Sequence, residues 1–323
     1  MFSLKLGGIN VSVSDLIVPR TKNEMKCVFF GGKGGVGKTS SAASAAVWLA
    51  ERGYKTLIVT TDPAGNKLSD VFEQAVGSKV TPIEGVNNLY GIEIDAKKAA
   101  EEYRERILRP LRGVQSEGFI KTLEQQLDSP CAEEMAAFDR FVEYVEAREY
   151  DVIIFDTAPT GLTLRLLELP SAWSNYIGKT ATLGGMTCIG PAEALASYKE
   201  HYDRAIRTLT DTKTTAFILV LVPEATPISE TERAMKELNV LGIKVAGIIV
   251  NSVITKQACE DVPFFLKRYE MQQRHLDHIY NRFNGIKIAE APLLDTEVKG
   301  LKTLSLFAEN LYEQNNPLVK EHA

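Results

Sequence analysis

The sequence predicts an α/β fold in which a doubly wound, mostly parallel sheet carries an inserted helical subdomain. Two observations support this prediction. Continuous apolar runs of strand length recur along the chain, and helical patterns follow several of them. Apolar runs without alternation are typical of strands covered on both faces, as in a parallel sheet. One of these runs also leads through a glycine-rich turn directly into a helical pattern, so we expect strands and helices to alternate around one sheet.

The expected strands are the short apolar runs. They span residues 26–30, 56–61, 89–94, 152–155, 216–222, 245–250 and 286–288. Helices are expected over residues 38–52, over residues 227–241 and within residues 263–283. Pro227 at a helix start and Gly242 just past its end are typical helix boundary residues.

Two long intervals interrupt this alternation. Residues 96–149 and 162–211 carry helical patterns without a convincing strand. Each interval is too long for a simple crossover between neighbouring strands. We therefore expect a single domain over residues 25–315 with a helical subdomain built from these two inserts. Residues 1–24 are expected to form a peripheral N-terminal arm, and residues 316–323 a C-terminal tail.

The composition is that of a globular protein without a charge bias toward nucleic acid. Apolar residues make up 45% and charged residues 24% of the chain, and 37 Lys and Arg against 42 Asp and Glu give a formal net charge of −5. No apolar run reaches the roughly 18 residues of a membrane-spanning helix, and the start, MFSLKLGGIN, lacks the apolar stretch of a signal peptide. We therefore expect a cytoplasmic protein with no nucleic-acid partner.

A phosphate-binding loop follows the first expected strand. Residues 32–39 read GKGGVGKT, which has the Gly-x4-Gly-Lys-Thr spacing between a strand and a helix. Glycines let successive backbone N–H groups face phosphates at the positive end of the following helix. Lys38 is expected to reach the β- and γ-phosphates, and the Thr39 hydroxyl to bind Mg²⁺. The sequence therefore predicts a site for ATP and Mg²⁺. The nucleotide contacts expected from the loop are Gly34, Gly35, Val36, Gly37, Lys38, Thr39 and Ser40.

Acidic residues end two further strands, at the sheet edge where α/β proteins bind ligands. Asp62 ends the run TLIVTTD, and Asp156 ends DVIIFD. One carboxylate can orient the attacking water and the other can hold the Mg²⁺ ion. We assign Asp62 to the water and Asp156 to the metal, with helix capping as the alternative for either. Asn251 follows the strand in GIIVNSV, where it can read an adenine edge or serve as a turn residue.

Lys33 places a second lysine inside the loop. This pattern resembles the deviant Walker A motif of ATPases related to the nitrogenase iron protein and the cell-division ATPase MinD. In that family the lysine crosses a dimer interface to the partner's nucleotide. The resemblance therefore implies a homodimer in which Lys33 acts in trans, stabilising charge on the transferring phosphoryl group as an arginine finger does.

Four segments together resemble one branch of these ATPases: GGKGGVGKT, TTDPAGNKLSD, DTAPTGLTLRLLELP and IIVNSV. That branch holds the arsenite-pump ATPases of the ArsA family and the ATPases that target tail-anchored membrane proteins. The resemblance covers residues 26–311, and it implies adenine contacts from Asn251 and Pro292. Leu162 replaces a histidine usual in the family, and Gly65 stands where the family has His or Ser. If the missing histidine relays metalloid binding to the nucleotide in the family, we expect the coupling in this chain to differ.

Two cysteines favour the arsenite-pump ATPases. The segments EQQLDSPCAEEMAAFDRF around Cys131 and MTCIGPAEALASYKEHY around Cys188 each resemble an ArsA segment that carries an arsenite-binding cysteine. Arsenite is thiophilic and takes thiolate ligands. Cys131 also follows Ser-Pro, which reads as the start of a helix. Cys188 lies three residues before Pro191, which reads as the first residue of a helix over residues 192–209. Helix N-termini lower a thiol pKa. Cys27 and Cys259 are expected to be structural.

The predicted function is an arsenite- or antimonite-stimulated ATPase that works as a homodimer. The family implies a membrane arsenite carrier as partner, through which the protein reaches the membrane, and a metallochaperone as a further partner. The alternative is a targeting chaperone for tail-anchored membrane proteins. Those chaperones typically carry a zinc-binding CxxC, whereas residues 262–265 here read VPFF. A regulator that uses ATP only as a switch is a third hypothesis.

Overall fold

The computed structural model describes most of the sheet and the helices that cover it. It describes residues 13–21, 24–60, 67–128, 136, 139–140, 142–146, 148–157, 186–187, 190–191, 199–259 and 262–313. The strands are β1 Lys26–Gly31, β2 Thr56–Thr60, β3 Thr81–Pro82, β4 Leu89–Glu93, β5 Val152–Asp156, β6 Met186–Thr187, β7 Gly190–Pro191, β8 Thr215–Leu221, β9 Val245–Val253 and β10 Lys287–Pro292. Each strand expected from an apolar run is present, with ends shifted by a few residues.

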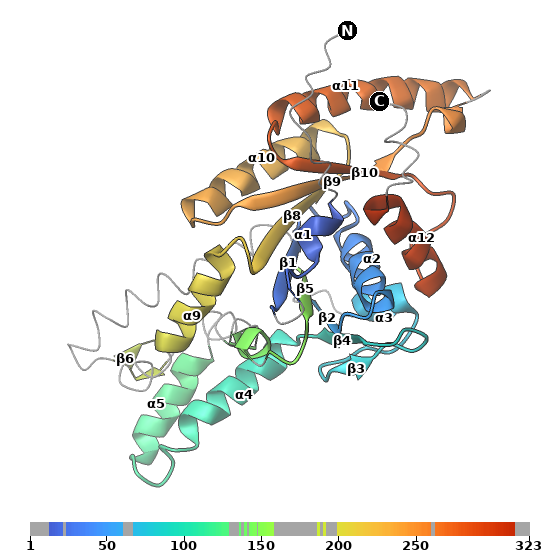
Figure 1. The fold of residues 1–323 in the computed structure, drawn as a ribbon. Helices are drawn as coiled ribbons and strands as arrows, with labels where there is room; N and C mark the ends of the chain where they lie inside the picture. Colours follow the sequence, from blue (N-terminus) through green and yellow to red (C-terminus); the bar gives the residue numbers. More distant parts are fainter. Residues whose placement is uncertain are drawn as a thin grey trace.

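The main sheet has the order β10-β9-β8-β1-β5-β2-β4-β3 (Figure 1). Every neighbouring pair in it is parallel except β3 and β4. The strand β1, which precedes the glycine-rich loop, lies between β8 and β5. The prediction of a doubly wound, mostly parallel α/β fold is confirmed.

Helices cover both faces of this sheet. They are α1 Ser14–Ile17, α2 Lys38–Glu51, α3 Lys67–Phe72, α4 Ala96–Leu108, α5 Glu117–Leu127, α9 Lys199–Thr210, α10 Ala225–Val240, α11 Pro263–Arg282 and α12 Leu301–Tyr312, with a 3-10 turn at Gln257–Cys259. Helix α10 begins two residues before Pro227. Proline is tolerated there because the N–H groups of a first helical turn have no partner within the helix.

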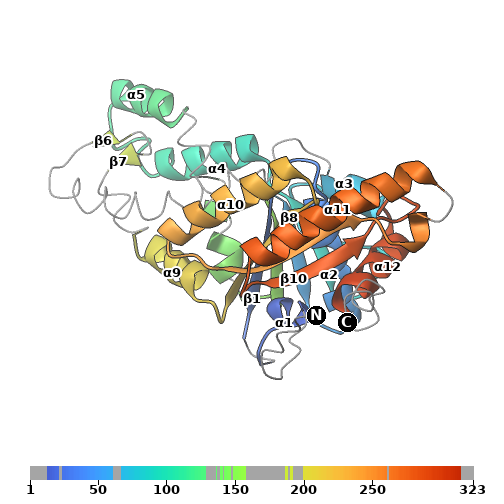
Figure 2. The ribbon, with the colours of Figure 1, turned by 90° about the horizontal axis from the view of Figure 1, so that it is seen from above.

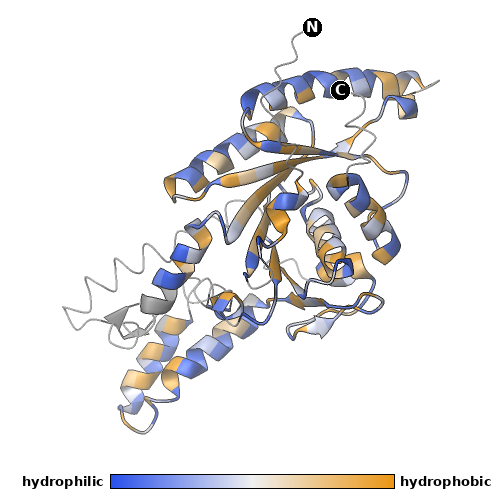
Figure 3. Cartoon of the chain, viewed as in Figure 1, coloured by the Kyte–Doolittle hydropathy of each residue, from blue (hydrophilic) through white to orange (hydrophobic). Residues whose placement is uncertain are grey.

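Alternate side chains of β1 point into two separate cores. Cys27 and Phe29 belong to a buried cluster that includes residues of α9, α10 and α11. Val28 and Phe30 belong to a second cluster on the opposite face, with residues of α1, α2, α3 and α12. Figure 3 shows the central strands largely in the apolar colour, whereas α10 and α11 carry hydrophilic turns. Burial on both faces explains why the strands read as unbroken apolar runs.

A row of stacked aromatic rings crosses the centre of the sheet. The Phe29 ring centroid lies 4.6 Å from that of Phe155 in β5 and 4.5 Å from that of Phe217 in β8. These residues are direct register partners. The rings therefore favour the register between β1, β5 and β8. Strand β1 leads into the loop, and β5 ends at Asp156.

Helices α4 and α5 form a small core together with Ala136. Their buried residues include Tyr103, Leu108 and Leu123, and none of the cluster belongs to the two cores of the sheet. Both views show these helices extending away from the sheet (Figures 1 and 2). Strand β7 contacts α5, and β6 pairs with β7 in an antiparallel hairpin. The hairpin departs from the expectation that residues 162–211 hold no strand.

The expected N-terminal arm packs partly against the core. Ile17 is fully buried in α1, and Val13 is also buried. A Cβ atom added to Gly247 of β9 would lie only 2.6 Å from Cδ1 of Leu16, so α1 approaches β9 closely. None of the helices in the described part of the chain is long and apolar enough to span a membrane.

Candidate functional site

The glycine-rich loop leaves the carboxyl end of β1 and enters α2. Its first residue, Gly32, lies so close to β8 that an added Cβ would come within 2.2 Å of the Val220 carbonyl oxygen. Its last residue before the helix, Gly37, has left-handed backbone angles, with φ of 93° and ψ of 27°. Side chains at these two positions would push the loop off the sheet or strain its backbone.

The N-terminus of α2 is prepared for an anion. No side chain caps it, and its first turn contains no acidic residue. The first N–H groups of a helix lack partners within the helix, and the helix dipole makes this end positive. These N–H groups and this positive end are therefore available to a phosphate group.

The two lysines of the loop have different partners. Lys38 is buried, and its Nζ donates to the Lys33 carbonyl oxygen at 2.9 Å. The Lys33 side chain is 39% exposed, and its Nζ lies 3.5 Å from Oε1 of Glu230 in α10. Lys33 is thus held toward a helix of its own chain.

Thr39 and Asp156 meet at the carboxyl edge of the sheet. The Thr39 hydroxyl donates to Asp156 Oδ2 at 2.7 Å, and the Thr60 hydroxyl lies 3.5 Å from the same oxygen. Asp156 is the buried last residue of β5, and its register partners are Phe30 of β1 and Thr60 of β2. Parallel pairing therefore places this carboxylate beside the start of α2.

The donor set at this edge fits Mg²⁺. A hydroxyl and a carboxylate are hard oxygen donors, and Mg²⁺ in proteins commonly takes one or two carboxylates together with phosphate and water oxygens. Among the described residues, no group of three or more His, Cys, Asp or Glu side chains forms a metal site. A nucleotide would therefore have to supply further oxygen ligands.

Asn251 and Pro292 line one cavity of about 500 Å³ beside Ser40 of α2. They come together because β9 and β10 are neighbours, with Pro292 in register with Val253. Leu293, Val298 and Phe307 add apolar surface. The cavity has the size and the mixed polar and apolar lining of a small-molecule site.

The Asn251 side chain also holds the phosphate loop. Its Nδ2 donates to the Val36 carbonyl oxygen at 2.9 Å, and its Oδ1 accepts from the Ser252 N–H at 2.8 Å. The sequence predicted an adenine contact at this position but not this bond to the loop, since Val36 and Asn251 are far apart in the chain.

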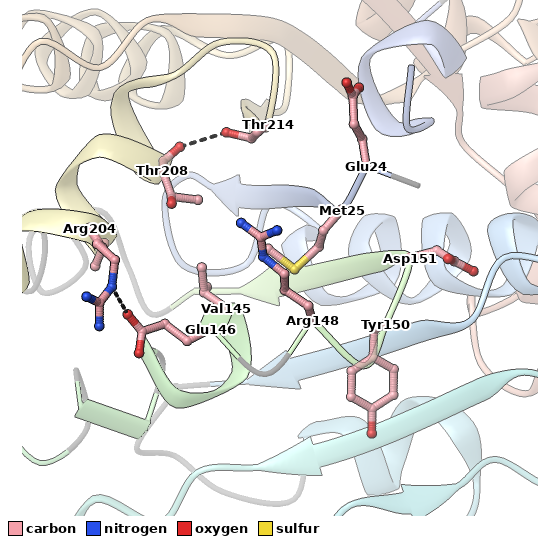
Figure 4. Close-up of a pocket in the computed structure, with 11 residues that line it drawn as sticks. Glu24, Met25, Val145, Glu146, Arg148, Tyr150, Asp151, Arg204, Thr208 and Thr214 are labelled. Carbon is pink, nitrogen blue, oxygen red and sulfur yellow. Dashed lines mark hydrogen bonds and ion pairs between the residues drawn. The ribbon is translucent and has the colours of Figure 1, made fainter. Parts of the chain in front are cut away.

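A larger cavity lies at the opposite edge of the sheet (Figure 4). It measures about 660 Å³, and its lining residues Met25, Asp151 and Thr214 immediately precede β1, β5 and β8. Ligands of open α/β sheets bind outside the carboxyl ends of the strands, and this cavity is at the amino ends. We therefore place the candidate site at the phosphate loop, although the cavity beside the loop is the smaller of the two.

A family model described as anion-transporting ATPase, ArsA_ATPase, matches residues 25–313. The chain belongs to this family. Membership of this family confirms the predicted resemblance, and the description of the family as ATPases agrees with the predicted enzyme class, an ATP hydrolase.

The relatives include arsenical pump-driving ATPases and ASNA1 homologs. The chain is 46% identical over 297 residues to the "Putative arsenical pump-driving ATPase" of Halobacterium salinarum, covering 92% of this chain and 45% of that protein. It is 36% identical over 282 residues to the "Arsenical pump-driving ATPase" of Escherichia coli, covering 86% and 48%. It is 34% identical over 309 residues to "ATPase ASNA1 homolog 1" of Paramecium tetraurelia, covering 89% and 92%. The chain spans about half the length of the first two.

Several residues singled out in the sequence analysis lie outside the described part of the chain. They are Asp62, Gly65, Cys131, Leu162 and Cys188. The described neighbour of Asp62 is Thr60, which ends β2 in register with Asp156.

The helix start expected near Cys188 is wrong at Pro191. Pro191 belongs to β7 and pairs with Met186, and the described helix begins at Lys199. Proline is compatible with a two-residue strand because such a strand has few ladder hydrogen bonds that need its N–H.

Cys27 and Cys259 agree with the structural role expected for them. Cys27 is fully buried in β1, and burial raises the pKa of its thiol to about 12. Cys259 is also buried, and its Sγ donates to the Thr255 carbonyl oxygen at 3.3 Å. A buried, protonated thiol is a poor nucleophile and a poor metal ligand.

Proposed function

We propose that this chain is an arsenite- or antimonite-stimulated ATPase that works as a homodimer. The observation that carries the metalloid part is the contact between α5 and β7. Helix α5 ends at Leu127, four residues before Cys131, and β7 begins at Gly190, two residues after Cys188. This contact links the two helical inserts, residues 96–149 and 162–211, in which the candidate thiolate ligands lie, and it supports a site shared by both inserts.

The chemistry at the phosphate loop follows from its side chains. The N–H groups of Gly34 to Ser40 bind the phosphates. The Lys38 ammonium group gives up its hydrogen bond to the Lys33 carbonyl oxygen and donates to phosphate oxygens instead. Thr39 and Asp156 would hold a Mg²⁺ ion, which would supply positive charge opposite the β- and γ-phosphates. Asp62 orients the attacking water. Asn251 and Pro292 contact the adenine in the cavity that they line.

The homodimer supplies Lys33 to the nucleotide of the other subunit. In the single chain Lys33 pairs with Glu230, and both side chains are about one-third exposed or more. Ion pairs at such surfaces contribute roughly 0–1 kcal/mol. Lys33 can therefore leave Glu230 at little cost when a second phosphate group is presented to it.

The helical inserts form the metalloid-binding part in this proposal. We propose that residues 96–149 and 162–211 act as one subdomain of the domain over residues 25–315, on the support of the separate core of α4 and α5. The names of the pump-driving relatives support delivery to a membrane arsenite carrier, with a metallochaperone as a possible donor. The protein itself is proposed to be cytoplasmic.

The decisive experiment measures ATP hydrolysis with and without arsenite. Wild-type activity should rise with arsenite, and Cys131→Ser or Cys188→Ser should remove the increase while basal hydrolysis remains. Serine keeps the approximate shape but not the soft thiolate. Cys259→Ser is the matched control, because its hydroxyl can still donate to the Thr255 carbonyl oxygen. A control that lost the response as fully as the two variants would contradict the assignment.

The ASNA1-named relatives favour a second candidate, a targeting chaperone for tail-anchored membrane proteins. The same assay separates the two candidates. A wild-type ATPase rate that ignores arsenite, together with ATP-dependent capture of a hydrophobic helical peptide, would support the chaperone.

A further inference from the structure

Gln272 is a buried polar residue within the long helix α11. Its side chain is 4% exposed, whereas most polar residues of α11 face solvent. Its Nε2 donates to the Ser252 carbonyl oxygen at 3.1 Å, and its Oε1 accepts from the Ile254 N–H at 2.9 Å. The nitrogen and the oxygen of the amide thus both form hydrogen bonds with the backbone at the end of β9. A buried amide in this arrangement fixes the position of the segment that it binds.

The segment bound by Gln272 has an unusual backbone. Ser252 has a φ of 59°, in the left-handed region that residues other than glycine seldom adopt. Ser252 and its neighbour Asn251 both line the cavity beside α2. A strained conformation persists only where the surroundings hold it in place, and the Gln272 bonds to Ser252 and Ile254 lie on either side of Val253.

The hydrogen bonds continue from this segment to the phosphate loop. The Ser252 N–H donates to Asn251 Oδ1, and Asn251 Nδ2 donates to the Val36 carbonyl oxygen. Gln272, Ser252, Asn251 and Val36 therefore form one connected path from α11 to the loop. Three parts of the chain that lie far apart in the sequence meet along it.

We propose that Gln272 is a positioning residue of the nucleotide site. It does not touch the nucleotide. It holds the Ser252 backbone in place and thereby fixes the position of Asn251. Asn251 in turn lines the cavity and holds Val36 of the loop through its hydrogen bond. This inference rests on the proposed binding of ATP at the loop, and it adds α11 to the elements that determine the affinity for ATP.

The test compares Gln272→Met with Leu276→Ala. Methionine fills nearly the same volume as glutamine but can make neither hydrogen bond. Leu276 is one turn further along α11 and is buried in the core between α11 and the sheet, and its aliphatic side chain has no hydrogen-bonding group. The full chain is used without arsenite, with ATP affinity measured by titration calorimetry and stability by thermal unfolding.

Gln272→Met should raise the Kd for ATP about tenfold, which corresponds to about 1.4 kcal/mol. Leu276→Ala should lower the melting temperature at least as much while leaving that Kd within twofold. The variant Asn251→Ala should also weaken binding, and the double variant with Gln272→Met should be weakened by less than the product of the two effects, because both act on one path.

Each remaining outcome decides the question. A Gln272→Met protein that binds ATP as the wild type does, or effects that simply multiply in the double variant, would overturn the inference. If Gln272→Met does not fold, Gln272→Glu decides, because it keeps the acceptor for Ile254 and replaces the donor to Ser252 by an oxygen that the Ser252 carbonyl repels. An unchanged Kd in that variant would also overturn the inference. A wild-type protein that does not bind ATP would instead refute the proposed function.

Discussion

The substitution Gly37→Ala tests how the phosphate loop depends on its contact with β9. Gly37 has a φ of 93°, which costs an L-residue such as alanine about 1–2 kcal/mol. The added Cβ would also lie 2.2 Å from Nδ2 of Asn251 and 3.3 Å from its Cγ. The amide must therefore move, and its bond to the Val36 carbonyl oxygen is lost.

The magnitude follows from these two costs. Loss of one neutral hydrogen bond costs about 1 kcal/mol, so the binding-competent loop is disfavoured by about 2–3 kcal/mol in total. If that energy is paid on binding, the Kd for ATP rises roughly 30- to 150-fold. Calorimetric titration with ATP measures this directly.

Gly53→Ala is the matched control for backbone strain. Gly53 has a φ of 86°, close to that of Gly37, and an added Cβ there would meet nothing within 4 Å. The control should lose about 1–2 kcal/mol of stability from the same backbone strain and keep its affinity for ATP. A Gly37→Ala protein that binds ATP within threefold of the wild type would refute the reasoning, as would a control that weakens binding equally.

Three further predictions concern the core, a thiol and the dimer. Phe29→Ala removes the central ring of the stacked row and should lower the free energy of unfolding by about 3–5 kcal/mol; a denaturant titration showing a loss below 1 kcal/mol would contradict this. Cys27, whose thiol pKa is raised to about 12 by burial, should stay protonated at pH 8. Iodoacetamide should therefore leave it unmodified in the native protein, as mass spectrometry can check. Mixing Lys33→Ala with Lys38→Ala subunits should restore part of the ATPase activity if Lys33 acts in trans, and a mixture as inactive as either parent would count against that role.

Much of this fold could be predicted because its main signals are local. The unbroken apolar runs located the strands, since burial on both faces of the sheet demands apolar residues at every position. The place of Asp156 beside Thr39 also followed, because parallel strands end at a common edge. The register partner Phe30 then brings the two side chains within hydrogen-bond distance.

The contacts that escaped prediction are those between distant parts of the chain. Nothing near Asn251 in the sequence indicates that its amide reaches Val36, and nothing in the sequence of α10 marks Glu230 as the partner of Lys33. Gln272 reads as one polar residue among many in α11. The hairpin of β6 and β7 was missed for another reason, because two-residue strands have no periodicity that a sequence can reveal.

The separate core of α4 and α5 has a consequence for how this chain can evolve. Because its buried residues belong to neither core of the sheet, substitutions among them act first on the packing of that helical pair. Residues of α4 and α5 can therefore change while the strands and helices around the phosphate loop keep their own packing constraints. Within the family we therefore expect residues 96–128 to diverge faster than residues 26–60.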